Sequence, residues 1–197
     1  MGRKIIYLAA ALLLCAGSAR AQRGLPGQVG LTLWGGTVDG VVLRDRMGAY
    51  RFWTALDAVR YTRAHGYWSV GVTLLRKDYT YRGAAGRERV PMAQATVSTG
   101  YAAPVVSDRR RVFTLLAAVE GLAGYEVTGW GDKALRDGSS VRCRDGLVGG
   151  GAISAIAECY LADRLQLLLR VRERCLAGSD TGAFHTELGF GIRIIIR

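Results

Sequence analysis

The sequence predicts an all-β protein, an eight-stranded antiparallel up-and-down β-barrel of the outer-membrane type. Three observations lead to this fold class: a clear alternation in the last strand, the number and length of strand-like segments, and connections of unequal length. In residues 184–196, every second side chain starting at Phe184 is apolar or threonine, and those between are polar, charged or glycine apart from Ile195. A strand with one apolar face needs apolar surroundings on that side. In a membrane barrel, lipid supplies them from outside.

Strand-like segments follow one another after the first 21 residues. Most are longer than the strands of soluble proteins, which average about five or six residues. Tilted strands that cross a bilayer need about nine to eleven. The content of 27 glycines and 3 prolines suits strands that need small side chains and keep their backbone donors. We expect strands at residues 28–38, 49–61, 67–81, 92–103, 111–126, 147–163, 165–176 and 183–196.

The expected connections alternate in length. Outer-membrane barrels have short periplasmic turns and longer outside loops, with both termini in the periplasm. The first, third, fifth and seventh connections are mostly the longer ones and span residues 39–48, 82–91, 127–146 and 177–182. The others span residues 62–66, 104–110 and 163–164. Aromatic side chains with a polar group favour the membrane interface, and those near the expected strand ends are Tyr50, Tyr67, Trp68, Tyr79, Tyr81, Tyr101, Tyr125 and Tyr160.

The first 21 residues have the pattern of a cleaved export signal. Arg3 and Lys4 precede a short apolar run, and residues 19–21 read Ala-Arg-Ala, a small-x-small cleavage pattern. We therefore expect residues 22–197 to form one exported barrel domain in the outer membrane. A lipoprotein signal at Cys15 is the competing interpretation, although leucine precedes this cysteine where a small residue is usual.

The formal net charge of +11 raises the question of an anionic partner. Lipopolysaccharide, nucleic acid or an acidic protein could meet it. We favour a solvated loop surface together with paired charges inside the barrel. After signal cleavage, Cys143, Cys159 and Cys175 remain, without metal-ligand spacing, so we expect no metal and no cofactor. A disulfide between Cys143 and Cys175 is left open.

Register arguments place charges in the barrel interior. Pairing Leu176 with Ala183 sets Arg172 opposite Glu187 and Arg174 opposite His185, all on polar strand faces. A three-residue turn at the other end of residues 165–176 would set Glu158 opposite Arg170. The interior of an eight-stranded barrel is just wide enough for side chains, and charges buried there must be paired. The predicted lumen network is Glu158, Arg170, Arg172 and Glu187, with Glu120 and Lys77 as further candidates.

Two segments could carry other chemistry. His185 and Glu187 share a strand face, as in a lipid-modifying enzyme, but no serine lies beside them and nearby arginines explain both. We therefore expect no enzymatic activity. The 127–146 loop combines Trp130 with Lys133 and Arg136. This composition suits nucleic-acid binding or a solvated loop, and we favour a loop that binds a partner protein.

Four collinear stretches, QRGLPGQVG, RVPMAQATVSTGY, GYEVTGWGDKALRDGS and ADRLQLLLRVRERCLAGSDTGAFHTELGFGI, span essentially the whole mature chain. Together they resemble the TraO family of conjugative-transposon transfer proteins. The resemblance implies a part of the mating apparatus, a type IV secretion-like assembly that moves DNA between Gram-negative cells, with other conjugal transfer proteins as partners. It carries over no catalytic residue. Cys143 and Cys175 depart from the pattern expected of the family.

A lumen filled by paired charges would not pass a DNA strand. The expected function is therefore an outer-membrane scaffold or anchor of the apparatus, in contact with membrane lipid and without direct contact to nucleic acid. The alternatives are a generic small outer-membrane barrel with an envelope or adhesion role, and a soluble periplasmic barrel that binds an apolar ligand. The sequence leaves open the identity of the partners, the oligomeric state and whether basic loops touch DNA or lipopolysaccharide.

Overall fold

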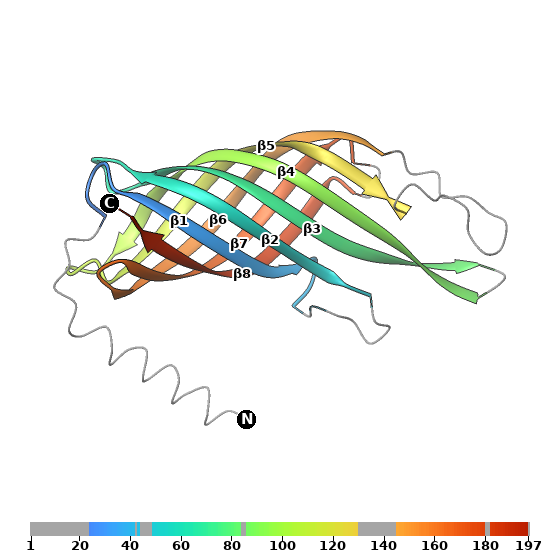
Figure 1. The fold of residues 1–197 in the computed structure, drawn as a ribbon, viewed down its shortest axis with the longest axis horizontal. Coiled ribbons are helices and arrows are strands. Elements are labelled where there is room, and N and C mark those ends of the chain that lie inside the picture. Colours follow the sequence, from blue (N-terminus) through green and yellow to red (C-terminus); the bar gives the residue numbers. More distant parts are fainter. Residues whose placement is uncertain are drawn as a thin grey trace, which may run out of the picture.

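The computed structural model describes residues 24–41, 43, 49–83, 86–129, 145–179 and 182–196. In this part of the chain, eight antiparallel strands follow sequence order and close into a barrel, because β1 also pairs with β8 (Figure 1). The predicted fold class is confirmed. Within the same ranges, no helix is long and apolar enough to cross a membrane. The strands are β1 (Val29–Val38), β2 (Arg51–Tyr61), β3 (Tyr67–Gly83), β4 (Gly86–Ser107), β5 (Phe113–Thr128), β6 (Gly146–Ala162), β7 (Leu165–Ala177) and β8 (Phe184–Ile195).

The hairpin of β3 and β4 is the main departure from the predicted boundaries. The sequence predicts a loop at residues 82–91, but β3 continues to Gly83 and β4 begins at Gly86, with Pro91 opposite Asp78. This prediction was wrong because backbone pairing continues through a segment whose charged and glycine residues give no apolar alternation in the sequence. In Figure 1 the two strands extend together past the rest of the wall.

The two ends of the barrel carry different connections. Residues 62–66, 108–112 and 163–164 connect strands at one end, which we call the turn end. Gly27 donates its backbone N–H to Tyr61 there, and Ile196 donates to Val29, so both ends of the described chain also lie at the turn end. The opposite end, which we call the loop end, carries the connections that follow β1, β3, β5 and β7.

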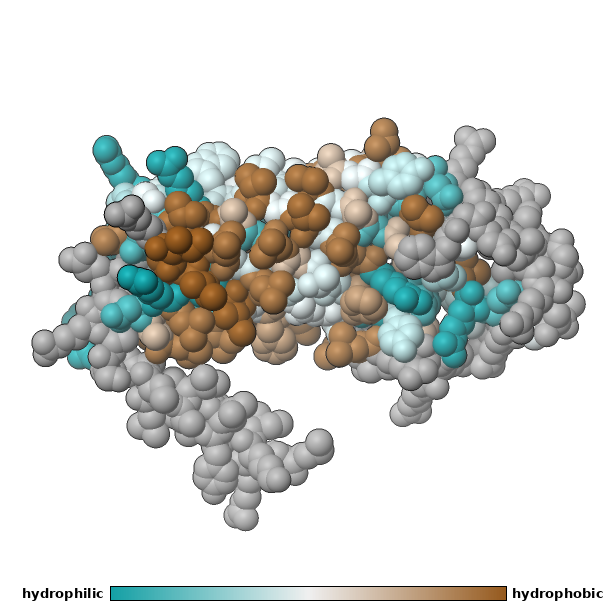
Figure 2. All heavy atoms as spheres, viewed as in Figure 1, coloured by the Kyte–Doolittle hydropathy of each residue, from teal (hydrophilic) through white to brown (hydrophobic). Residues whose placement is uncertain are grey.

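The outer surface of the wall is apolar, whereas the interior combines charged and polar side chains with a cluster of buried hydrophobic ones. Leu33, Ile153 and Phe190 face outward with 62%, 64% and 65% of their surface exposed. In Figure 2 the apolar residues cover the middle of the barrel, with hydrophilic residues near both ends. On β8, Ile192 points outward and Arg193 inward, as the alternation predicts. A soluble barrel with an apolar interior is therefore excluded for the described residues.

Aromatic side chains mark both ends of the apolar surface. Trp68 and Tyr101 lie 5.1 Å apart, centroid to centroid, near the turn end, and Tyr50 and Phe52 lie 6.4 Å apart near the loop end. Three of the tyrosines predicted at the interface point inward instead. Their strand positions belong to the inner face, where a phenol can reach buried hydrogen-bonding and cationic groups. They are Tyr67, Tyr79 and Tyr160.

Glycines on the inner face of β8 make room for the two tryptophans of the interior. A Cβ atom on Gly191 would lie 2.5 Å from Cε3 of Trp34, and one on Gly189 would overlap the ring of Trp53. The two indole rings lie 6.5 Å apart. The narrow barrel therefore accommodates both indoles because the glycines of β8 have no side chain opposite them.

Candidate functional site

The barrel interior contains most of the buried charge, arranged in three layers along the axis. In the layer nearest the turn end, Arg193 of β8 is the central group. Its Nη1 donates to Glu158 Oε1 at 2.5 Å and to the Tyr61 hydroxyl at 2.8 Å, and its Nε donates to Thr32 Oγ1 at 2.8 Å. Its guanidinium carbon lies 4.3 Å from the ring centroid of Tyr67. Arg193 thus links β8 to β2 and β6, neither of which is its neighbour in the wall.

The middle layer is built around Arg170 of β7. Its guanidinium carbon lies 4.3 Å from the ring centroid of Trp34 and 4.8 Å from that of Trp53, which is cation–π geometry. Its Nη1 lies 3.5 Å from Asp57 Oδ2 and 4.0 Å from Glu120 Oε1. Asp57 also accepts a hydrogen bond of 2.7 Å from the indole N–H of Trp34. The buried cation is therefore held by two aromatic faces and two carboxylates.

The third layer joins two arginines of β7 to one carboxylate of β8. Glu187 accepts from Arg172 Nη1 at 3.3 Å and from Arg174 Nη1 at 2.8 Å. Arg172 also pairs with Glu120 through Nη2. Arg174 Nη2 donates to Gln94 Oε1 at 2.7 Å, which connects β7 to β4 across the interior. Side chains from facing strands therefore meet inside the lumen at every level.

At the loop end, Asp39 fastens the seam between β1 and β8; we call this group the Asp39 clasp. Its Oδ2 accepts from Lys77 Nζ at 2.6 Å and from His185 Nδ1 at 3.0 Å, and its Oδ1 accepts from the backbone N–H of Thr186 at 2.8 Å. Burial alone would raise the pKa of the Asp39 carboxyl, but the hydrogen bonds from His185 and Lys77 outweigh it and hold this pKa well below its usual value.

All four residues of the predicted lumen network lie in the interior and are buried: Glu158, Arg170, Arg172 and Glu187. The predicted register between β7 and β8 is confirmed, with Arg172 opposite Glu187. Of the two further candidates, Glu120 joins the interior pairs, whereas Lys77 belongs to the Asp39 clasp.

The predicted register between β6 and β7 was wrong. Glu158 lies opposite Leu168 rather than Arg170, because the turn has two residues instead of three and the pairing shifts by one more residue between Tyr160 and Ala162. Such an irregularity adds a residue to one strand, so it changes the partner of every residue beyond it. Glu158 binds Arg193 instead of Arg170.

Sequence reasoning missed several interior residues: Arg193, Asp57, Trp34, Trp53 and, at the rim, Asp39. Arg193 could have been found, since it continues the polar face that contains Glu187. The partners of Arg170 could not, because they lie on strands that only the curvature of the closed wall brings near.

The other predicted residues are placed as follows. Trp130, Lys133, Arg136 and Cys143, like the export signal and Cys15, lie outside the described residues. Cys159 lies opposite Phe113 near the turn end and Cys175 opposite Phe184 near the loop end, and no disulfide joins them. A search of the described residues finds no group of three or more His, Cys, Asp or Glu side chains that could hold a metal ion.

A solved structure shows the same fold. Neisserial surface protein A aligns with a TM-score of 0.50 at 9% identity, over 85% of this chain and 95% of that one. Ail, the attachment invasion locus protein of Yersinia pestis, gives a TM-score of 0.45 at 12% identity, over 86% of this chain and 100% of that one. A search of curated protein sequences found no match.

The sequence itself matches a known family over most of its length. The profile described as "Conjugative transposon protein TraO" matches residues 25–196, which include all eight strands of the barrel. The resemblance seen in the four sequence stretches is thereby confirmed. The chain belongs to the TraO family of conjugative transposon proteins.

Proposed function

We propose that this protein is an outer-membrane component of a conjugative-transposon DNA transfer apparatus of the type IV secretion-like kind. It acts as a scaffold or anchor for other transfer proteins rather than as the DNA pore, and it performs no catalysis. Its family membership supports the association with conjugation. The barrel supports a place in the outer membrane.

The dimensions of the outer surface support insertion in a bilayer. On β3, the outward side chains Trp68, Val70, Val72 and Leu74 precede Arg76. From Trp68 to Arg76 the strand rises roughly 26 Å at about 3.3 Å per residue. At a tilt of about 40° it spans roughly 20 Å upright, near the roughly 25 Å apolar band of outer-membrane barrels. By the usual orientation of these barrels, the turn end would face the periplasm.

The observation that carries the non-pore role is the set of bonds across the lumen. Arg193 binds Glu158, Arg170 binds Asp57 and Arg174 binds Gln94, each between strands that are not neighbours. Opening a passage for DNA would separate several buried charge pairs. Removing one partner of such a pair costs about 3–5 kcal/mol, so a wide opening is unfavourable.

An in-frame deletion in donor cells tests the scaffold role. We expect transfer frequency to fall by several orders of magnitude and the other transfer proteins to stop co-purifying as one assembly. Unchanged transfer and unchanged co-purification would remove the basis for the proposal, and a generic envelope or adhesion role would then be favoured.

Conductance in planar bilayers tests the closed lumen separately. The purified barrel is expected to show no stable channels of a size that passes a nucleic acid strand. Long-lived openings of high conductance in the wild-type protein would contradict a scaffold with a filled lumen.

A further inference from the structure

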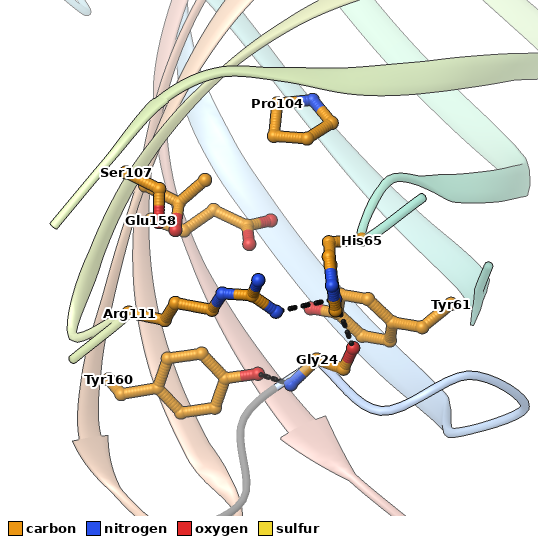
Figure 3. Close-up of a pocket in the computed structure, with 9 residues that line it drawn as sticks. Gly24, Tyr61, His65, Pro104, Ser107, Arg111, Glu158 and Tyr160 are labelled. Carbon is orange, nitrogen blue, oxygen red and sulfur yellow. Dashed lines mark hydrogen bonds between the residues drawn. The ribbon is translucent and has the colours of Figure 1, made fainter. Parts of the chain in front are cut away.

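A small cavity opens at the turn end, beside the layer of Arg193, and Tyr61 and Glu158 of that layer also line the cavity. Its volume is about 110 Å³, and its walls come from β2, β4, β6 and the turns at 62–66 and 108–112. Figure 3 shows His65 and Arg111 reaching toward one another across it, with Glu158 and Ser107 nearby and Tyr160 turned toward Gly24. Its size fits one small functional group, such as a carboxylate, rather than a ring system.

Two residues of this cavity are held in an uncommon backbone conformation. His65 has φ 61° and Arg111 has φ 52°, the left-handed region that residues other than glycine rarely adopt. Each residue closes a β-turn, since His65 N–H donates to Thr62 O and Arg111 N–H donates to Asp108 O. These turns direct both side chains into the same space (Figure 3).

The guanidinium of Arg111 has further N–H donors besides the one that contacts His65. Its Nη1 lies 2.6 Å from His65 Nδ1. A guanidinium can only donate, so His65 Nδ1 is the acceptor in this contact, and the same Nδ1 lies 3.4 Å from the carbonyl oxygen of Gly24. Within the described ranges, no carboxylate pairs with Arg111. A planar guanidinium binds a carboxylate through two parallel hydrogen bonds, which is a strong and directional interaction.

Glu158, the acidic residue in the cavity wall, does not neutralise the charge of Arg111. Glu158 is 3% exposed and its Oε1 accepts from Arg193 at 2.5 Å, so its charge is already neutralised from the interior. The hydroxyl of Tyr160 accepts from the backbone N–H of Gly24 at 3.0 Å. The positive charge that faces the opening is therefore that of Arg111.

The rim around the cavity is strongly basic. Asp108 and Asp163 are the acidic residues of the turns, and Asp108 is engaged with the backbone N–H of Phe113 at 3.3 Å. Basic side chains outnumber them in the described turns and adjoining strand end. A cluster of one sign attracts ligands of the opposite sign. The exposed arginines of the two turns that line the cavity are Arg63, Arg109 and Arg110, and Arg60 and Arg164 are further exposed arginines of the turn end.

We propose that the turn end binds an acidic peptide segment, with one carboxylate in the cavity on Arg111 and further carboxylates on the rim arginines. This rests on the proposed function and deepens it, because it names the partner class: a periplasmic protein segment rich in aspartate and glutamate. A single nucleic acid strand is the less suitable ligand. Strand binding relies on exposed aromatic platforms for the bases, and Trp68 and Tyr101 instead contact each other at the wall with their rings tilted by 56°.

Fluorescence anisotropy with a labelled decapeptide of alternating glutamate and glycine tests the site on the full mature chain in detergent micelles. We expect saturable binding that weakens at least tenfold in Arg111→Gln and at least threefold in the rim variant Arg63→Gln/Arg109→Gln. The matched control Arg76→Gln, an outward-facing arginine at the loop end, should stay within twofold of wild type. The rim variant leaves the strained positions untouched, so it keeps the test valid if Arg111→Gln folds poorly.

Three results would overturn the inference: no saturable binding, equal losses in Arg111→Gln and Arg76→Gln, or displacement of the peptide by oligothymidylate at equal charge. The deletion experiment separates the two proposals. Failed peptide binding with lost transfer refutes this site and keeps the scaffold. Specific peptide binding with unchanged transfer keeps the site and refutes the scaffold.

Discussion

The inner and outer faces of β8 show two different kinds of sequence constraint. On the inner face, Glu187 binds Arg174 and Arg193 binds Glu158 at hydrogen-bond distance. Gly191 leaves room for the indole of Trp34. On the outer face, Phe190 and Ile192 are exposed, and no hydrogen-bonding partner distinguishes one from the other. Inner positions therefore require a specific side chain, whereas outer positions require only an apolar one. Substitutions on the two faces can break or sharpen this contrast.

Replacing Glu187 by alanine should have the largest effect. The change leaves Arg172 and Arg174 without their shared carboxylate in the interior. We expect the free energy of unfolding to fall by about 3–5 kcal/mol. Urea titration of the purified barrel in phospholipid vesicles measures it. The matched outer-face change Ile192→Val should cost less than about 1.5 kcal/mol, and similar losses in the two variants would refute the contrast.

A charge on the outer face should be the next most costly change. Ile192 is 53% exposed on the wall. The substitution Ile192→Arg is expected to cost about 2–4 kcal/mol if the residue lies near the middle of the bilayer. The same titration in vesicles measures it, with Ile192→Leu as the apolar control. A loss no greater than that of the control would indicate that this face does not contact hydrocarbon.

A methyl group added to the inner face should also destabilise the barrel. Gly191→Ala places a Cβ against the indole of Trp34, whereas Gly35→Ala, on the outer face of the adjacent β1, meets nothing within 4 Å. We expect a loss of about 1–3 kcal/mol for the first, because overpacking displaces a ring that has no free space. Thermal unfolding followed by gel mobility compares the two. Equal melting temperatures would show that the interior yields more easily than its packing suggests.

The Asp39 clasp should give the smallest effect and a dependence on pH. The pKa of Asp39 is lowered in the folded barrel. The carboxylate therefore stabilises the fold at any pH above the ordinary aspartate pKa of about 3.9, and this stabilisation is lost as the pH falls below that value. Asp39→Asn should cost about 1 kcal/mol at neutral pH, since the group is half-buried. The difference in the free energy of unfolding between wild type and Asp39→Asn should shrink on acidification. A difference that is constant from pH 7 to pH 2 would exclude the clasp as its source.

The fold was largely predictable because alternation with a period of two survives in every strand, and strand length separates membrane barrels from soluble ones. The β7–β8 register followed from a short connection and two matching polar faces, as Arg172 opposite Glu187 shows. Glu158 was misplaced for two reasons: the turn at residues 163–164 is one residue shorter than predicted, and a local irregularity at residues 160–162 leaves no signal in composition. The partners of Arg170 and Arg193 on non-neighbouring strands depend on the curvature of the wall, and the residue pattern of a single strand does not predict that curvature.

The β1–β8 seam has a consequence for how the protein is made. Strand β1 is synthesised early and β8 last, yet the wall closes only when these two meet. Contacts so far apart in sequence form slowly because the chain loses much freedom in bringing them together. Until β8 docks, Arg172 and Arg174 of β7 lack the carboxylate of Glu187. Buried cations without all their partners are unfavourable in an apolar medium, so we expect closure of the wall and its entry into such a medium to occur as one cooperative event.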